Sequence, residues 1–152
     1  MEVKKTALLV FTRTAANEAK HKNLLGEGSS RNQNFVIAKQ LIEKTKGIAS
    51  QSGLDVIVCN DFNQKGETFG QRLSNAIADS FARGYDSVIA IGSDTPALNV
   101  SHINEAVKSL QNQNVVLGPS TDGGVYLIGM HQNAFCPNSF ENLPWLTGLV
   151  HK

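Results

Sequence analysis

The chain has 152 residues and a formal net charge of +1 at pH 7, with 41% hydrophobic and 18% charged residues. This balance excludes a disordered or fibrous protein, and the length favours one domain over residues 1–152. The small net charge offers no broad electrostatic surface for nucleic acid. No apolar run approaches the roughly 18 residues that span a bilayer, and the N-terminus shows no signal-peptide cleavage site, so we expect a cytoplasmic protein.

Apolar runs and helical periodicity alternate along the chain. In chain order they predict a strand over 6–11, a polar segment over 13–31, a helix over 32–50, a strand over 55–59, a helix over 68–83, a strand over 87–91, a helix over 101–111, and strands over 114–117 and 125–130. Strands that are apolar throughout are typical of a sheet covered on both faces. The predicted class is therefore α/β, with three layers and a mostly parallel sheet flanked by helices.

Periodicity also predicts which side chains are buried. In the helix over 32–50, the residues near one face are Phe35, Ala38, Leu41, Ile42, Ile48 and Ala49. Of the two cysteines, Cys59 ends an apolar run and is expected in the core, whereas Cys136 lies in a loop-like stretch. Neither the cysteines nor the four histidines have the spacing of a zinc site or a disulfide framework.

Ligands of open α/β sheets bind outside the carboxyl ends of the strands. The segment AIGSDTPAL places Asp94 just beyond a predicted buried strand, with only Gly92 and Ser93 between. Gly92 lets a ligand approach the backbone closely, and Pro96 fixes the chain beyond the acid. A carboxylate held in this way suits Mg²⁺ or Mn²⁺ on a nucleotide diphosphate. The alternative is an Asp that bonds its own loop amides.

A second segment, GPSTDGGVYLIG, combines an acid with glycines between two apolar runs. Asp-Gly in this setting is a strong hairpin signal, so a tight turn without chemistry is one interpretation. In the other, Asp122 joins Asp94 at a metal ion. Gly123 and Gly124 would then leave room for a sugar or phosphate against bare backbone.

Basic residues near the same predicted edge are candidates for binding phosphate. Arg13 and Lys20 lie in the polar segment after the first strand, and Arg72 lies near the start of the helix over 68–83. A helix N-terminus attracts phosphate, but a solvated surface position is the alternative for each of the three. The GxxxxGK[ST], GxGxxG and HExxH motifs do not occur, so P-loop, dinucleotide and zinc-protease classes have no motif support.

Five segments together resemble one bacterial family: FTR, GETFGQRL, IGSDTPAL, LGPSTDGGVYLIG and PWLT, in this order along nearly the whole chain. The family is that of the rSAM/selenodomain-associated transferases. The resemblance implies a glycosyltransferase with the nucleotide-diphospho-sugar transferase fold, which is GT-A-like and Rossmann-like. The sequence is more distantly similar to molybdenum-cofactor guanylyltransferase and 2-phospholactate guanylyltransferase.

The resemblance also implies roles for individual residues. Asp94 corresponds to the acid that holds the divalent metal. Asp122, with Gly123 and Gly124, corresponds to the acceptor side of the cleft. Arg13 and Arg72 correspond to two family arginines, and Lys20 keeps the lysine of the first loop.

The leading hypothesis is a metal-dependent glycosyltransferase that uses a nucleotide-activated sugar and Mg²⁺ or Mn²⁺. Asp122 would orient the acceptor, bind metal or act as the base. The alternative enzyme is a nucleotidyltransferase that releases pyrophosphate. A third hypothesis is a non-catalytic nucleotide- or sugar-binding module. It is suggested by the first-loop sequence AANEAKHKNLL, by Thr68-Phe69-Gly70 where the family has Asp-Leu-Gly, and by a C-terminus that is short for the family.

Overall fold

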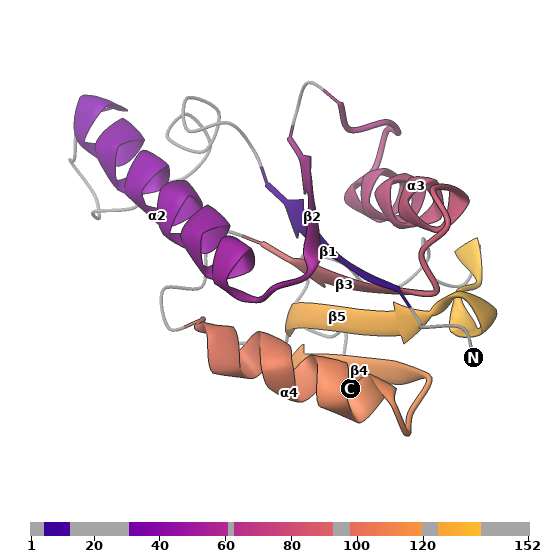
Figure 1. The fold of residues 1–152 in the computed structure, drawn as a ribbon. Helices are drawn as coiled ribbons and strands as arrows, with labels where there is room; N and C mark the ends of the chain where they lie inside the picture. The colour runs from indigo at the N-terminus through magenta and orange to yellow at the C-terminus, as the bar shows by residue number, and fades with distance from the viewer. Residues whose placement is uncertain (1–4, 13–30, 61–62, 93–97, 120–124, 138–152) are drawn as a thin grey trace.

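The computed structural model describes residues 5–12, 31–60, 63–92, 98–119 and 125–137. Figure 1 shows the elements, which are β1 (Thr6–Phe11), α2 (Arg31–Gln51), β2 (Asp55–Cys59), α3 (Phe69–Ala82), β3 (Ser87–Ile91), α4 (Val100–Leu110), β4 (Val115–Pro119), β5 (Val125–His131) and a short 3-10 helix, η1 (Gln132–Ala134). The first three strands have the bounds predicted from the sequence. The helices and the last two strands differ from the prediction by one or two residues at an end.

The five strands form one sheet in the order β2-β1-β3-β5-β4. β1 runs parallel to both of its neighbours, β2 and β3. β5 is antiparallel to β3 and to β4, so the sheet is mostly parallel, as predicted, with one reversed strand. The reversal arises because only residues 120–124 separate β4 from β5, too few for the crossover that a parallel pair needs. The two strands pair directly, with Leu117 opposite Ile128, which is the pairing that the Asp-Gly signal predicts.

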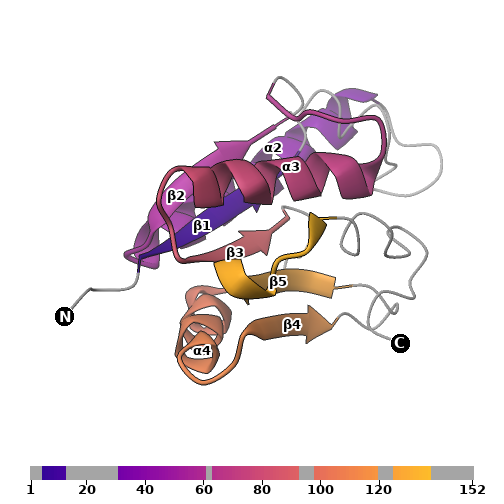
Figure 2. The ribbon, with the colours of Figure 1, turned by 90° about the vertical axis from the view of Figure 1, so that its right-hand side faces the viewer.

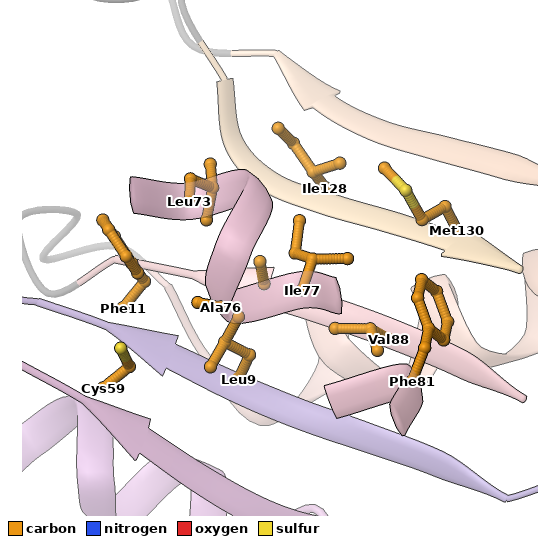
Figure 3. Close-up of a cluster of buried hydrophobic side chains, with 11 residues drawn as sticks. Leu9, Phe11, Cys59, Leu73, Ala76, Ile77, Phe81, Val88, Ile128 and Met130 are labelled. Carbon is orange, nitrogen blue, oxygen red and sulfur yellow. The ribbon is translucent and has the colours of Figure 1, made fainter. Parts of the chain in front are cut away.

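Helices cover both faces of the sheet, which confirms the three-layer prediction. α3 lies on one face, whereas α2 and α4 lie on the other (Figure 2). Figure 3 shows the core beneath α3, where side chains of the helix point toward those of the strands. The buried residues of this cluster are Leu9, Phe11, Cys59, Leu73, Ala76, Ile77, Phe81, Val88, Ala90, Ile128 and Met130. A second cluster lies under α2 and α4 and includes Leu8, Val10, Ile89, Ile91, Ile103 and Leu110.

Helix α2 differs from the prediction at its start. Ala38, Ile42 and Ala49 are buried, but Phe35 is 39% exposed. Figure 1 shows the start of α2 projecting past the strands, and Phe35 lies near that start although its spacing matches the buried face. Although α2 has 21 residues, no helix in the described ranges is both long and apolar enough to cross a membrane.

Candidate functional site

The strand directions bring one end of each of the five strands to the same edge of the sheet, which we call the carboxyl edge. β1, β2, β3 and β4 end there, and β5 begins there. β1 lies between β2 on one side and β3 on the other, so the connections leaving β1 and β2 cross opposite faces of the sheet. In an open α/β sheet, such a switch point is where ligands bind. The topology therefore places the expected binding site beyond Thr12, Asn60 and Gly92.

Most of the residues predicted for the site lie outside the described ranges. These are Arg13, Lys20, Ser93, Asp94, Asp122, Gly123 and Gly124. Each belongs to a segment that follows a described strand end at the carboxyl edge. Residue 13 follows Thr12, residue 93 follows Gly92, and residues 120–124 connect β4 to β5. The roles of these residues stay predictions, whereas the strand ends from which their segments start lie within the described ranges.

Gly92 is described and half-buried at the end of β3. The preceding residue, Ile91, is buried and pairs with Val10 of the parallel strand β1. Gly92 therefore lies beside the end of β1, in the position expected for a residue at the switch point.

Arg72, the other predicted residue within the described ranges, lies in the first turn of α3. Its Nη1 donates to the carbonyl oxygen of Glu67 at 3.0 Å. The same turn carries a capping box, in which the Thr68 hydroxyl accepts from the Gln71 amide nitrogen at 3.1 Å. Gln71 Oε1 in turn accepts from the amide nitrogen of Glu67 at 2.9 Å. The structure thus gives Arg72 a role that the sequence does not predict, because it holds the chain that enters α3.

The segment 63–68, which we call the 63–68 loop, contacts the ends of β1 and β2 at the carboxyl edge. Gln64 Nε2 donates to the carbonyl oxygens of Thr12 at 2.7 Å and of Cys59 at 3.4 Å. Asn63 Oδ1 accepts from the amide nitrogen of Asn60 at 2.7 Å. Sequence reasoning missed Gln64, because an amide in a polar loop carries no signal of a partner 52 residues away.

Helix α4 begins at the carboxyl edge, on the face of the sheet opposite to α3. Its N-cap, Asn99, accepts through its side chain from the amide nitrogens of Ser101 and His102. The amide nitrogen of Asn99 donates to His102 Nδ1 at 3.1 Å, which completes a second capping box. The His102 ring lies 5.6 Å, centroid to centroid, from the ring of Tyr126 on β5. The segment that contains Asp94 therefore ends at a firmly built helix start.

Within the described ranges, no three His, Cys, Asp or Glu side chains come together to hold a metal ion. The predicted ligands Asp94 and Asp122 lie outside those ranges.

Cys59 is buried, as predicted, and burial raises the pKa of its thiol, with the negative charge of Asp79 adding to the increase. This thiol belongs to the core cluster under α3.

A family model described as an uncharacterized protein conserved in bacteria, DUF2064, matches residues 36–147. The chain is also 28% identical over 115 residues to 2-phospho-L-lactate guanylyltransferase of Methanocaldococcus jannaschii. That alignment includes 67% of this chain and 51% of the relative, so the chain spans about half the length of the curated relative that it matches.

A crystal structure from Desulfovibrio desulfuricans G20, of a protein provisionally named a nucleotide-diphospho-sugar transferase, superposes with a TM-score of 0.85 at 25% identity. The superposition covers 97% of this chain and 72% of the other. The similarity confirms the predicted fold. The association with rSAM proteins is not addressed by these similarities and stays a prediction.

Proposed function

The chain belongs to DUF2064, a family of uncharacterized proteins conserved in bacteria, and we propose that it transfers a group from a nucleotide-activated donor bound at the carboxyl edge. The observation that carries the proposal is the superposition of 97% of the chain on a protein named as a nucleotide-diphospho-sugar transferase. The switch point between β1 and β3 supports it independently, because α/β sheets bind ligands there.

In the proposed complex, the nucleotide lies over the ends of β1, β2 and β3. Gly92 and Ser93 let it approach the backbone. Arg13 and Lys20 bind its phosphates, Arg13 as a planar fork and Lys20 as a point charge. Arg72 adds positive charge at the N-terminus of α3, where the helix dipole also favours an anion.

We propose Asp94 and Asp122 as the ligands of Mg²⁺ or Mn²⁺, since both metals prefer carboxylate oxygens. When bound, the metal ion neutralises charge that develops on the leaving phosphate. Asp94 would hold the ion from the end of β3. Asp122, from the connection between β4 and β5, would also orient the acceptor or take its proton.

Two group transfers fit this arrangement, and a different relative favours each. Glycosyl transfer from a nucleotide sugar is favoured by the structural neighbour's name. Nucleotidyl transfer, which releases pyrophosphate, is favoured by the guanylyltransferase relative. The released product separates them, because glycosyl transfer gives a nucleoside diphosphate and nucleotidyl transfer gives pyrophosphate.

The proposal is tested by thermal unfolding with nucleoside triphosphates, nucleoside diphosphates and nucleotide sugars, each with Mg²⁺, Mn²⁺ or EDTA. A ligand present at about 100 times its Kd stabilises the protein by about 2.7 kcal/mol. We expect stabilisation that needs metal and is lost in Asp94→Asn. The matched control is Asp79→Asn, an exposed acid on α3, which should bind as the wild type does. Absence of stabilisation by every nucleotide, or unchanged metal-dependent binding in Asp94→Asn, would contradict the proposal.

A further inference from the structure

We propose a second binding site, for a neutral saccharide, in a polar pocket at the edge of the sheet opposite the carboxyl edge. The pocket has a volume of about 440 Å³, which is the size of a small-molecule site, and all the residues that line it lie in the described ranges. Three segments form it: the connection from α4 to β4, the residue before β3, and the end of β5 with η1 (Figure 1). The assignment is independent of the proposed function.

Hydrogen bonds between the three segments hold the backbone of the pocket. The amide nitrogen of Gln132 donates to the carbonyl oxygen of Asp86, and that of His131 donates to the carbonyl oxygen of Asn114, both at 2.9 Å. The His131 ring adds a bond from Nε2 to the carbonyl oxygen of Leu110 at 2.6 Å. A ligand therefore meets a frame that is already formed, which lowers the entropy cost of binding.

Side-chain carboxamides make up most of the lining, and all of them are exposed. They belong to Gln111, Asn112, Gln113, Asn114, Gln132 and Asn133. Within the described part of the chain, none of these six carboxamides is engaged in a hydrogen bond with another residue. A carboxamide both donates and accepts, and so does each hydroxyl group of a sugar. Six such groups around one pocket therefore match a ligand that carries several hydroxyl groups.

The charges around the pocket disfavour an anion. Asp86 is an acid, and no Lys or Arg is among the residues that line the pocket. Helix α4 ends at Leu110, so the negative end of its dipole also lies beside the pocket. Both features repel phosphate, which separates this pocket in kind from the proposed nucleotide site.

Other classes of ligand fit the lining less well. Leu110 is the one hydrophobic residue among those that line the pocket, so a nucleobase or an apolar ligand finds little surface to pack against. A cation would use the exposed carboxylate of Asp86 and leave the six carboxamides unused. One oxygen of that carboxylate also accepts already from the amide nitrogen of Lys5, at 3.0 Å. A neutral saccharide uses the carboxamides and needs no opposite charge.

The length of β3 separates this pocket from the carboxyl edge. Asp86 precedes the strand and Gly92 follows it. The five residues of β3 span about 16 Å at about 3.3 Å per residue. A saccharide in the pocket and a nucleotide at the carboxyl edge can therefore be bound at the same time.

The experiment is a nuclear magnetic resonance titration of the isotope-labelled full chain with glucose, galactose, maltose, cellobiose and lactose. The side-chain amide signals of Gln111 and Gln132 report on the pocket directly. We expect at least one of these sugars to shift both signals to saturation, with a Kd of about 1 mM, the scale of a site with many hydrogen bonds and little apolar contact. Inorganic phosphate should leave both signals unchanged.

A matched pair of double variants tests the role of the carboxamides. Gln111→Ala/Gln132→Ala removes one from each of two walls and should weaken saccharide binding at least about tenfold, the scale of one or two lost hydrogen bonds. In this variant the signals of Asn112 and Asn133 report binding. The control, Gln40→Ala/Asn104→Ala, removes amides from exposed positions of α2 and α4 outside the pocket and should bind as the wild type does.

Asp86→Asn tests the choice of a neutral ligand over a cation. It removes the charge but keeps an oxygen that can accept from Lys5, so the saccharide Kd should change less than about threefold. Glucosamine, a cationic sugar, is the comparison probe. Binding of glucosamine without binding of any neutral sugar, and its loss in Asp86→Asn, would assign a cation site and overturn the proposal.

The remaining outcomes also decide the question. Absence of shifts with all five neutral sugars overturns the proposal, and so do shifts that persist unchanged in Gln111→Ala/Gln132→Ala. Saturating shifts with inorganic phosphate overturn the assignment of a neutral ligand. None of these results touches the proposed function, because that is tested separately with nucleotides at the carboxyl edge.

Discussion

The ring of Tyr126 on β5 lies against the backbone of Gly118 on β4. A Cβ added at Gly118 would lie 2.6 Å from Cζ of Tyr126, a distance that no real Cβ contact tolerates. The pairing of the two strands shifts register at Gly118 and Pro119. The Tyr126 ring also lies near that of His102 at the start of α4, with the two ring centroids 5.6 Å apart. Gly118 is therefore required by packing beside the carboxyl edge.

The first prediction is that Gly118→Ala destabilises the protein by about 1–3 kcal/mol, the usual cost of overpacking. The control is Gly47→Ala in α2, where an added Cβ has nothing within 4 Å. That change should stabilise the protein by about 0.5–1 kcal/mol, because Ala loses less backbone entropy than Gly in a helix. Urea unfolding of both variants measures the difference. Equal stability of the two variants would refute the contact between the Tyr126 ring and Gly118. In the Gly118→Ala background, Tyr126→Leu should recover part of the lost unfolding free energy.

Gly118 and Gln64 also illustrate what the sequence can and cannot reveal. The apolar run over 87–91 predicts β3 to the residue, since every residue of a buried strand is apolar or small. Glycines near Gly118 indicate a turn or a ligand, but nothing in the pattern indicates an aromatic ring above the backbone. Gln64 is a similar case, because its partner Thr12 is brought close only by the pairing of β1 and β2.

The site itself is predictable only to the level of the sheet edge. Alternation of strands and helices predicts that β1, β2 and β3 end at one edge of the sheet, and the structure confirms that arrangement of the strand ends. Which side chain in a loop meets which partner depends on backbone contacts that have no sequence period. Arg72 shows the limit, since its position near a helix start is predictable but its hydrogen bond to the Glu67 carbonyl is not. Phe35 shows that helical spacing alone does not decide which positions of a helix are buried.

The second prediction concerns His131, which joins three elements at the edge opposite the proposed site. Its Nε2 donates to the carbonyl oxygen of Leu110 at 2.6 Å, at the end of α4. Its Nδ1 then accepts from the hydroxyl of Ser87, at 2.5 Å, at the start of β3. His131→Phe keeps a ring but removes both bonds, and leaves the buried Ser87 hydroxyl without this partner. We expect a loss of about 1–3 kcal/mol in unfolding free energy.

Ser87→Ala provides the check, because it removes the group that His131→Phe leaves unsatisfied. In the double variant His131→Phe/Ser87→Ala, we expect part of the lost stability to return, since replacing both partners by apolar groups costs less than orphaning one. Strictly additive losses in this double-mutant cycle would show that the two side chains do not interact.

The third prediction concerns Tyr85, whose hydroxyl donates to Asp55 Oδ2 at 3.0 Å. This hydrogen bond raises the pKa of Tyr85 above its usual 10.0, with smaller contributions from burial and from the charge of Asp55. Because the pKa is raised in the folded state, the contribution to stability is complete below the unfolded pKa and is lost as pH rises through the folded pKa. The destabilisation caused by Tyr85→Phe should thus be constant from about pH 7 to 9 and shrink above about pH 10.

Urea unfolding midpoints of the wild type and Tyr85→Phe, measured across this pH range, test the direction of the Tyr85 pKa shift. Asp55→Asn serves as the background control, because it removes the carboxylate that raises the pKa of Tyr85. In that background, the pH dependence of the Tyr85→Phe effect should largely disappear. An effect that grows with rising pH would mean that the sign of the pKa shift is wrong.

The fourth prediction uses the contrast between the two cysteines. Cys136 is exposed, whereas Cys59 is buried in the core under α3. Burial raises the pKa of Cys59, the charge of Asp79 raises it further, and Arg83 opposes the increase. Since the thiolate is the reactive form, both access and protonation protect Cys59. At pH 8, Ellman's reagent should modify Cys136 roughly 100-fold faster than Cys59, which corresponds to an opening free energy of about 2.7 kcal/mol for Cys59.

The variant Cys136→Ser leaves Cys59, the slowly reacting thiol, as the remaining cysteine of the chain. Its remaining cysteine should react only as the core opens, so its rate should rise steeply across the urea unfolding transition. Above about pH 9 the unfolded chain gains from ionising Cys59 before the folded protein does, so the free energy of unfolding should fall there and Cys59→Ala should remove that part of the decline. Rapid modification of Cys136→Ser in the absence of urea would contradict the packing of β2 beneath α3, and with it the position of the strand end to which Gln64 is bonded.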